Sequence, residues 1–166
     1  MAGVQVGIIM GSDSDLKTMD KAAEVLKEFG IPYYLTVASA HRTPERVAEI
    51  ARRAETENWK MLIAGAGMAA HLAGVLAAHT VIPVVGVPID SSSLNGLDAL
   101  LSTVQMPGGI PVATMGIGAA GAKNAGLFAV KVLATHDANL RKKLIAYREK
   151  MARDLNEKAS RIERNG

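Results

Sequence analysis

The sequence predicts an α/β fold in which a parallel sheet of about five strands is covered by helices on both faces. Three observations support this prediction. Short apolar runs alternate with segments of helical periodicity along the 166 residues. The apolar runs are almost uninterrupted, as in strands that are buried on both faces. Five successive strand–helix alternations indicate three layers, and a flavodoxin-like strand order is the arrangement we expect.

The predicted strands are apolar runs that end at glycine or at small polar residues. They span 4–10, 33–38, 60–64, 83–87 and 112–116. The helices between them follow Asp15 and run to Phe29, open at Thr43, and lie near 70–79, 94–103 and 119–134.

Two of these helices have clear boundaries in the sequence. The first has one apolar face, and Gly30 and Pro32 end it. That face is formed by Met19, Ala22, Ala23, Leu26 and Phe29. The second opens with Thr43 as a hydroxyl cap, Pro44 at the first helical position and Glu45 in the first turn.

A last helix is expected over 137–163, with Asp137 as its cap. At ~1.5 Å per residue it would be ~40 Å long, which is longer than the domain needs for cover. Its apolar stripe consists of Leu140, Leu144, Tyr147, Met151, Leu155 and Ile162. This helix either lies across its own domain or packs as an arm on a neighbouring subunit, and we favour the arm. The helix at 72–78 is apolar nearly all round, which also favours an oligomer.

Composition and length fit a single globular domain over 1–166. Cysteine is absent, which excludes disulfides, thiolate catalysis and Cys-ligated metal sites. No apolar run is long enough to span a membrane, and the first run is too short for a signal peptide. We therefore expect a cytoplasmic protein without a membrane partner.

The net charge of +3 comes entirely from the C-terminal part of the chain. Residues 137–166 carry 9 basic and 5 acidic side chains, whereas residues 1–136 carry 10 and 11. The C-terminal charges alternate in sign, as on a solvated helix face, without an aromatic platform for stacked bases. We expect no nucleic-acid partner.

The most informative segment is Ser39-Ala-His-Arg-Thr-Pro44, which directly follows a predicted strand. Ligands of α/β proteins bind at the carboxyl ends of parallel strands. A hydroxyl, an imidazole and a guanidinium at such a place can hold an anion and move a proton. The loops that leave the first four strands are Gly11–Asp15, Ser39–Arg42, Gly65–His71 and Pro88–Gly96.

The first two loops together suggest a ribose phosphate site. Ser12 and Ser14 lie at the start of a helix, where free N–H groups favour an anion. Arg42 can close on the same anion with a forked contact, and Asp15 can accept hydrogen bonds from sugar hydroxyls. Helix capping is the alternative explanation for the serines and Asp15, but it does not account for Arg42.

His41 is the candidate for proton transfer, because an imidazole donates and accepts protons near neutral pH. A histidine that only closes a turn is the alternative. His71 follows the third strand and can line the same pocket, whereas His79 and His136 look like surface or capping residues. No histidine pair has ligand spacing with a carboxylate, so we expect no metal site.

Two glycine patterns resemble the dinucleotide-binding fingerprint. Gly65-Ala-Gly67-Met-Ala-Ala70 follows a predicted strand and has Asp90 near the next strand end. Gly116-Ile-Gly118-Ala-Ala-Gly121 lacks a following strand. The first pattern leaves a nicotinamide- or flavin-binding protein as a distant alternative, although the fingerprint normally follows the first strand.

Several long motifs, taken together and in order, cover nearly the whole chain. They are Gly11-Ser-Asp-Ser-Asp15, Ser39-Ala-His-Arg-Thr-Pro44, Gly65-Ala-Gly-Met-Ala-Ala-His-Leu72, Gln105-Met-Pro-Gly-Gly-Ile-Pro111 and Ala134-Thr-His-Asp137. With them the chain resembles the 5-(carboxyamino)imidazole ribonucleotide mutases, the class I form of the phosphoribosylaminoimidazole carboxylase catalytic subunit of purine biosynthesis. The resemblance implies a flavodoxin-like subunit of a homo-octamer, with no metal or organic cofactor.

The resemblance also implies roles for individual residues. Ser12, Ser39 and Arg42 would hold the nucleotide phosphate with help from Ser14, and Asp15 would bind the ribose. His41 would protonate the carbamate nitrogen as carbon dioxide leaves and later remove the proton from the ring carbon. The loop that contains Gly67 and His71 would confine the carbon dioxide. The unstable substrate would be handed over by the preceding synthetase.

Some positions depart from the family pattern. Met68 stands where many relatives carry glycine, and Ala73 where many carry proline. Relatives that carboxylate aminoimidazole ribonucleotide directly with carbon dioxide usually have Lys-Gly-Pro after the histidine. Here Arg42-Thr43-Pro44 favours the mutase, with direct carboxylation as the alternative.

Overall fold

The computed structural model describes residues 3–164, which form two compact units, 3–129 and 130–164. The first unit holds a five-stranded parallel sheet in the order β2-β1-β3-β4-β5. This is the flavodoxin-like order that the sequence predicts, so the predicted fold class is confirmed. The strands are β1 (Val6–Met10), β2 (Tyr33–Val37), β3 (Met61–Gly67), β4 (Val84–Ile89) and β5 (Ala113–Thr114).

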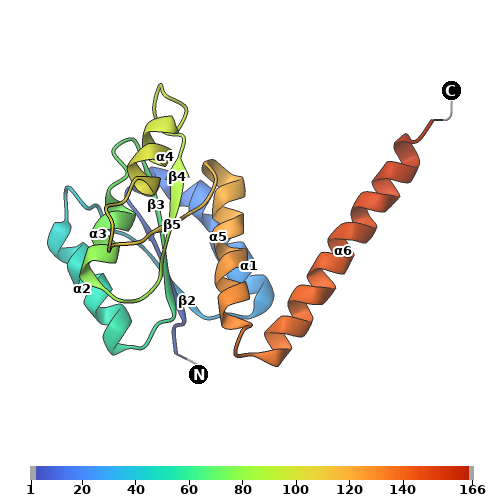
Figure 1. Ribbon diagram of the computed structural model, residues 1–166, viewed down its shortest axis with the longest axis horizontal. Coiled ribbons are helices and arrows are strands. Elements are labelled where there is room, and N and C mark those ends of the chain that lie inside the picture. The colour runs from blue at the N-terminus through green and yellow to red at the C-terminus, as the bar shows by residue number, and fades with distance from the viewer. Residues whose placement is uncertain (1–2, 165–166) are drawn as a thin grey trace. The chain divides into compact units, whose positions relative to one another are not determined.

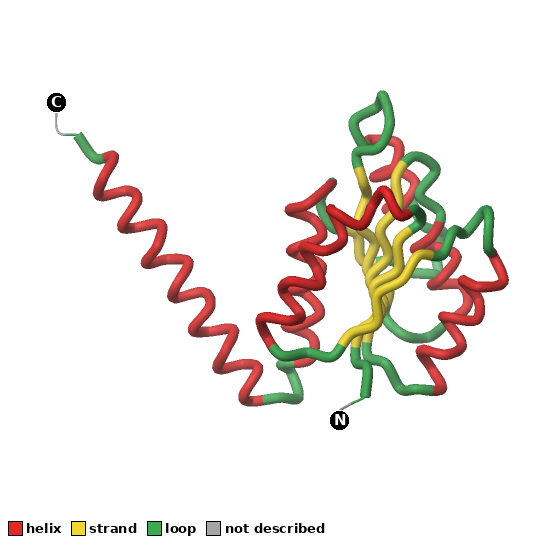
Figure 2. The backbone as a smooth tube through the Cα atoms, turned by 180° about the vertical axis from the view of Figure 1, so that it is seen from behind, coloured by secondary structure: helices red, strands yellow, loops and turns green. Residues whose placement is uncertain are grey.

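Helices cover both faces of this sheet (Figures 1 and 2). One face carries α1 and α5, and the other carries α2, α3 and α4. Their bounds are α1 Leu16–Phe29, α2 Pro44–Thr56, α3 Leu72–His79, α4 Leu97–Val104 and α5 Gly118–Leu133. Within residues 3–164, no helix combines the length and apolar content needed to cross a membrane.

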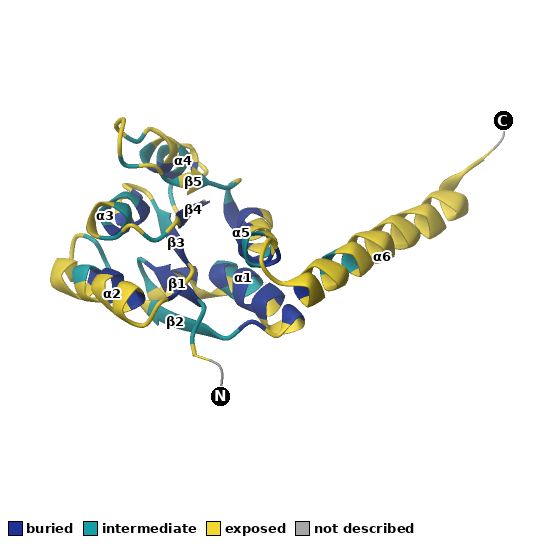
Figure 3. Ribbon diagram, turned by 60° about the horizontal axis from the view of Figure 1, so that its bottom comes forward, coloured by how far each residue is buried: buried dark blue, intermediate teal, exposed yellow. Residues whose placement is uncertain are grey.

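The core lies where β1 and β3 meet these helices. All five residues of β1 are buried, and so are all five residues of the apolar face predicted for α1 (Figure 3). Each fully buried Leu or Ile side chain contributes about 1.5–3 kcal/mol relative to exposure. Gly30 ends α1 with φ 74, the left-handed conformation that favours glycine at a helix end.

All five strands differ from their predicted bounds by one to three residues at one or both ends. The third strand runs on to Gly67 instead of ending at residue 64, because Gly65, Ala66 and Gly67 pair with β4. A Cβ at Gly65 would overlap the thioether of Met19. The absence of a side chain at Gly65 therefore lets the Met19 side chain of α1 pack directly against β3. At the sheet edge, β5 is only two residues long and pairs with β4 alone.

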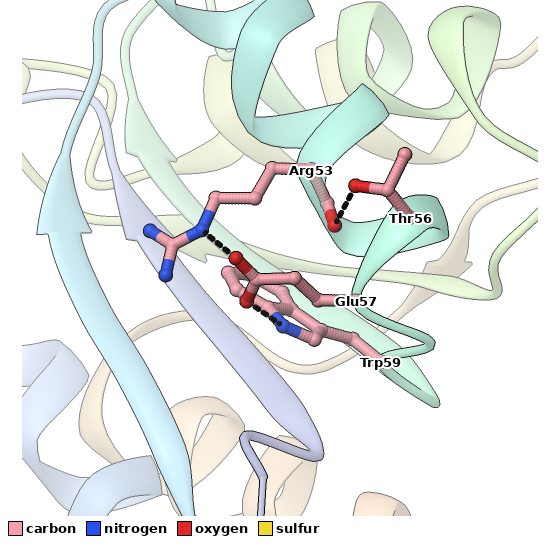
Figure 4. Close-up of polar contacts among 4 residues, drawn as sticks. All are labelled: Arg53, Thr56, Glu57 and Trp59. Carbon is pink, nitrogen blue, oxygen red and sulfur yellow. Dashed lines mark hydrogen bonds and ion pairs between the residues drawn. The ribbon is translucent and has the colours of Figure 1, made fainter.

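The C-terminal end of α2 is held by a cluster of side chains (Figure 4). Arg53 Nε lies 2.7 Å from Glu57 Oε1, and the indole N–H of Trp59 donates to Glu57 Oε2 over 3.0 Å. The Arg53 guanidinium also lies over the rings of Tyr34 and Trp59, at 4.6 Å and 5.3 Å from their centroids. This cluster joins α2 to β2 on the face of the sheet away from α1.

The second unit contains α6 (Ala138–Ile162), which matches the predicted last helix to within a residue at each end. The Asp137 carboxylate accepts from the backbone N–H groups of Asn139 and Leu140 over 2.8 Å and 3.0 Å, so the predicted cap is confirmed. Of the predicted apolar stripe, only Leu140 is buried. Met151, Leu155 and Ile162 are 49%, 66% and 75% exposed.

Candidate active site

A cavity of about 410 Å³ opens at the carboxyl ends of β1 to β4. The predicted site residues Asp15, Ser39, His41, Arg42, Gly67 and His71 all line it. The other lining residues are Gly11, Ala40, Ala66, Met68, Ala69, Leu72 and Ser91. The cavity therefore collects side chains from the loops that follow four different strands, as the topology of a parallel sheet requires.

The loop after β1 is closed by its own side chains. Ser12 caps a short helix, η1 (Asp13–Asp15), and its hydroxyl accepts a hydrogen bond from the Ser14 hydroxyl over 2.9 Å. Asp15 Oδ2 accepts from the Ser12 backbone N–H over 3.1 Å, which completes a capping box. The two serines form this cap and are not among the lining residues of the cavity, whereas Asp15 is.

Asp15 is the buried carboxylate of the site. Only 5% of its surface is exposed, and this burial raises its pKa above the ordinary value, because a charged carboxylate loses hydration there. Hydrogen bonds from Ser12 and Ser14 and the charge of Arg42 oppose the rise. Because the Asp15 carboxylate lines the cavity and has only Ser12 and Ser14 as hydrogen-bond donors among the described residues, it can accept further hydrogen bonds from a polar ligand.

Arg42 links the loops after β1 and β2. Its Nη2 donates to the Gly11 carbonyl over 3.2 Å, while its Nε and its backbone N–H both face Ser39 Oγ, at 3.4 Å and 3.2 Å. Between residues 3 and 164, no carboxylate forms an ion pair with Arg42. Its positive charge thus lies beside Ser39 on the cavity wall, where an anion can bind.

Thr43 does not act as the sequence predicts. It occupies the N-cap position before α2, and Pro44 and Glu45 follow as predicted, but its hydroxyl makes no capping hydrogen bond. The prediction of a hydroxyl cap is therefore wrong. The hydroxyl instead accepts from the Ser39 backbone N–H over 2.9 Å and donates to the Ser39 carbonyl over 3.2 Å.

Two imidazoles meet in the cavity. His41 Nε2 lies 2.8 Å from His71 Nδ1, and the two rings are 78° apart in an edge-to-face arrangement. This contact requires a hydrogen on one of the facing nitrogens and a lone pair on the other. The pair has the geometry for passing a proton, and it joins residues that are thirty positions apart in the chain. His79 and His136 are exposed, as predicted.

The loop after β3 passes close to the loop after β4. A Cβ at Gly67 would overlap Ser91 Oγ, so the serine side chain lies directly against this glycine. Ser91 was not among the predicted site residues, although it lies in one of the four predicted loops. Its only signal in the sequence is its place just after a buried strand.

The first glycine pattern does not have the geometry of a dinucleotide fingerprint. Gly65 and Gly67 both belong to β3, and α3 starts only at Leu72. Met68 follows with φ 55, a left-handed conformation that is unusual for a residue with a side chain. Across the described part of the chain, no three His, Asp or Glu side chains group as metal ligands would.

Comparisons with known proteins agree on one family. The model of the family described as AIR carboxylase matches residues 5–154. The chain is 56% identical over 161 residues to the N5-carboxyaminoimidazole ribonucleotide mutase of Pyrococcus horikoshii, covering 97% of this chain and 90% of that protein. It is 54% identical over 162 residues to the protein of the same name from Thermotoga maritima, covering 98% and 94%.

A solved structure has the same fold. The crystal structure of Treponema denticola PurE superimposes with a TM-score of 0.87 at 32% identity, covering 96% of this chain and 99% of that one. The family model and the relatives both extend over the sheet and all four loops of the cavity. The chain therefore belongs to the AIR carboxylase family.

Proposed function

We propose that this protein is an N5-carboxyaminoimidazole ribonucleotide mutase of purine biosynthesis. It would move the carboxylate of 5-(carboxyamino)imidazole ribonucleotide from nitrogen to the ring carbon and form 4-carboxy-5-aminoimidazole ribonucleotide. The observation that carries this proposal is the 56% identity, over 97% of the chain, to a protein that bears this name. The cavity supports it, because its polar side chains suit a phosphorylated ribonucleoside.

The substrate would be anchored at the β1 and β2 side of the cavity. Ser39 and Arg42 present a hydroxyl and a guanidinium to the phosphate. Ser12 and Ser14 do not line the cavity, but their hydroxyls lie at the start of the helical segment after β1 and would help to hold the phosphate from there. Asp15 would accept hydrogen bonds from the ribose hydroxyls. This arrangement would leave the imidazole ring near His41 and His71.

His41 would carry the proton in both half-reactions. As the carbamate N–C bond breaks and carbon dioxide leaves, His41 gives a proton to the nitrogen. The electron-rich ring carbon then attacks the carbon dioxide, and His41 takes back the proton that this carbon loses. The contact with His71 supports this role, since it orients the His41 ring.

Carbon dioxide must stay beside the ring between the two half-reactions. The loop of Gly67, Met68 and His71 would confine it, and Ala66, Ala69 and Leu72 make that part of the cavity wall apolar. Holding both fragments in one cavity makes recapture effectively unimolecular. These steps use no metal and no organic cofactor.

Several surfaces support assembly into a homo-oligomer, for which we propose an octamer. The exposed apolar residues of α6 suit an arm, over 137–163, that packs on a neighbouring subunit. In α3, which is apolar nearly all round, only Leu72, Ala73 and Leu76 are buried. We further expect a cytoplasmic enzyme that receives its unstable substrate from the preceding synthetase.

Direct carboxylation of aminoimidazole ribonucleotide is a second candidate, because the matching family is described by that reaction. The two reactions are distinguished by supplying each substrate separately. We expect 4-carboxy-5-aminoimidazole ribonucleotide to form rapidly, by its ultraviolet absorbance, from the N-carboxylated substrate. Rapid formation from aminoimidazole ribonucleotide and carbon dioxide alone would contradict the mutase.

A further inference from the structure

The hydroxyl of Thr43 forms hydrogen bonds with the loop that precedes it and none with α2, the helix that follows it. It forms two hydrogen bonds with the Ser39 backbone, and the Thr43 backbone N–H also donates to the Ser39 carbonyl over 2.9 Å. A threonine at an N-cap normally accepts a hydrogen bond from the helix that it starts. Here that contribution to α2 is given up, and both polar groups of the Ser39 backbone are fixed.

Fixing Ser39 has consequences along a chain of contacts. The Ser39 hydroxyl faces the Arg42 backbone N–H and Nε, and Arg42 Nη2 in turn reaches the Gly11 carbonyl on the neighbouring loop. Thr43 itself is absent from the lining residues of the cavity. It therefore acts on a ligand indirectly, through the loop that carries Ser39 and Arg42.

We propose that Thr43 is a positioning residue that holds Ser39 and Arg42 in the geometry that binds the substrate phosphate. The identity of this anion rests on the proposed function. Without the hydroxyl, the loop of residues 39–42 gains freedom, and binding must then supply the order that Thr43 provides. We expect the effect to fall mainly on affinity, because the hydrogen bonds of Thr43 go to Ser39, whose hydroxyl faces Arg42, whereas the His41 ring is held by its contact with His71.

Three variants of the full chain test this proposal. Thr43→Val keeps the shape of the side chain but removes its hydrogen bonds, and Thr43→Ser restores the hydroxyl. Thr56→Val is the matched control, since the exposed Thr56 hydroxyl donates to the Arg53 carbonyl over 3.0 Å at the other end of the same helix (Figure 4). The control removes one comparable hydrogen bond from α2 without touching the loop.

The readouts are KM and kcat with the N-carboxylated substrate, the affinity for ribose 5-phosphate, and hydrogen exchange of the Ser39 amide. For Thr43→Val we expect KM and the ribose 5-phosphate dissociation constant to rise about tenfold, with kcat little changed and faster Ser39 exchange. Thr43→Ser should recover most of the affinity, and Thr56→Val should behave like the wild-type protein.

Ribose 5-phosphate separates a failure of this proposal from a failure of the proposed function. If the wild-type protein binds ribose 5-phosphate but does not turn over the substrate, the mutase assignment fails, while the comparison of variants still tests Thr43. Unchanged affinity in Thr43→Val, or equal losses in Thr43→Val and Thr43→Ser, would overturn the positioning role. So would a wild-type protein that does not bind ribose 5-phosphate.

Discussion

At the scale of single residues, the proposed proton transfer depends on His41, and the pH dependence of stability depends on Asp15. His41 lines the cavity and contacts His71 there over 2.8 Å, whereas His79 at the end of α3 does not line the cavity. In the proposed mechanism, only His41 transfers a proton to and from the bound nucleotide. This difference makes them a matched pair for mutation.

We expect His41→Asn to lower kcat by about 10²–10⁴, the usual scale for a general acid–base group. Asparagine keeps a polar side chain of similar size but cannot exchange protons near neutral pH. Substrate affinity should change little, and His79→Asn should leave both constants unchanged. Steady-state kinetics check this, and a near-normal kcat in His41→Asn would remove His41 from the proton-transfer step.

The contribution of Asp15 to the free energy of unfolding depends on pH. Because burial raises its pKa, the native protein binds this proton more tightly than the unfolded chain does. The free energy of unfolding therefore falls as the pH rises from the ordinary aspartate pKa through the raised one. Above this range the ionised carboxylate lowers the stability of the native state, as is common for functional groups in buried sites.

Replacing Asp15 by asparagine should remove this cost. Asp15→Asn keeps an oxygen for the Ser12 N–H, so we expect it to be more stable than the wild-type protein at pH 7, with the difference shrinking toward pH 4. Urea unfolding at both pH values measures this. KM should rise at least about tenfold, since a charged acceptor is lost. A stability difference that does not vary with pH would contradict the role of burial.

At the scale of secondary structure, the sequence predicts elements correctly where apolar periodicity is strong. Its predictions are wrong where the end of an element depends on glycine or on a contact with another segment. The α1 face and the Asp137 cap were predictable, because each is a local pattern. The last three residues of β3 were not, since glycine is a poor strand former and is held here by pairing with β4. The Thr43 hydroxyl was mispredicted because its partner lies in the preceding loop.

The second glycine pattern has a packing explanation. Gly121 lies in the first turns of α5, and a Cβ there would overlap the backbone carbonyl of Gly116. The glycines at 116 and 121 thus allow the chain to enter α5 by a close turn. Gly108 provides a contrast, because it has open space around it and no left-handed φ.

We expect Gly121→Ala to lower the free energy of unfolding by about 1–3 kcal/mol, the usual cost of overpacking. The change goes against helix propensity, which alone would make alanine the more stable residue by about 1 kcal/mol. Gly108→Ala should stay within about 0.5 kcal/mol of the wild-type value. Chemical denaturation measures both, and a stabilised Gly121→Ala would show that the turn can relax.

At the scale of the whole molecule, the exposed apolar residues are the reason to expect contacts between subunits. Met151, Leu155 and Ile162 are largely exposed on α6, and Leu97 and Leu101 are about half exposed on α4. Such surfaces mark protein–protein contacts when they are grouped. The sequence indicated the stripe on α6 by its spacing, but the number of subunits depends on contacts with other chains, which a local pattern does not encode.

We expect the double variant Met151→Glu and Leu155→Glu to dissociate the proposed octamer into smaller assemblies, because charges would then lie in an apolar contact. Arg153→Glu places the same new charge on another side of α6 and should leave the assembly intact. Sedimentation velocity measures the size, with circular dichroism as the check on folding. An unchanged assembly in the double variant would show that the arm does not hold subunits together.

The mutase assignment itself is tested most directly by following the carboxylate carbon. The N-carboxylated substrate is labelled with carbon-13 at its carboxylate and supplied in excess unlabelled bicarbonate, and the product is read by NMR. Internal transfer within a closed cavity predicts that 4-carboxy-5-aminoimidazole ribonucleotide keeps the label. A product whose carboxylate is unlabelled would mean that carbon dioxide is captured from solution, and it would contradict the account.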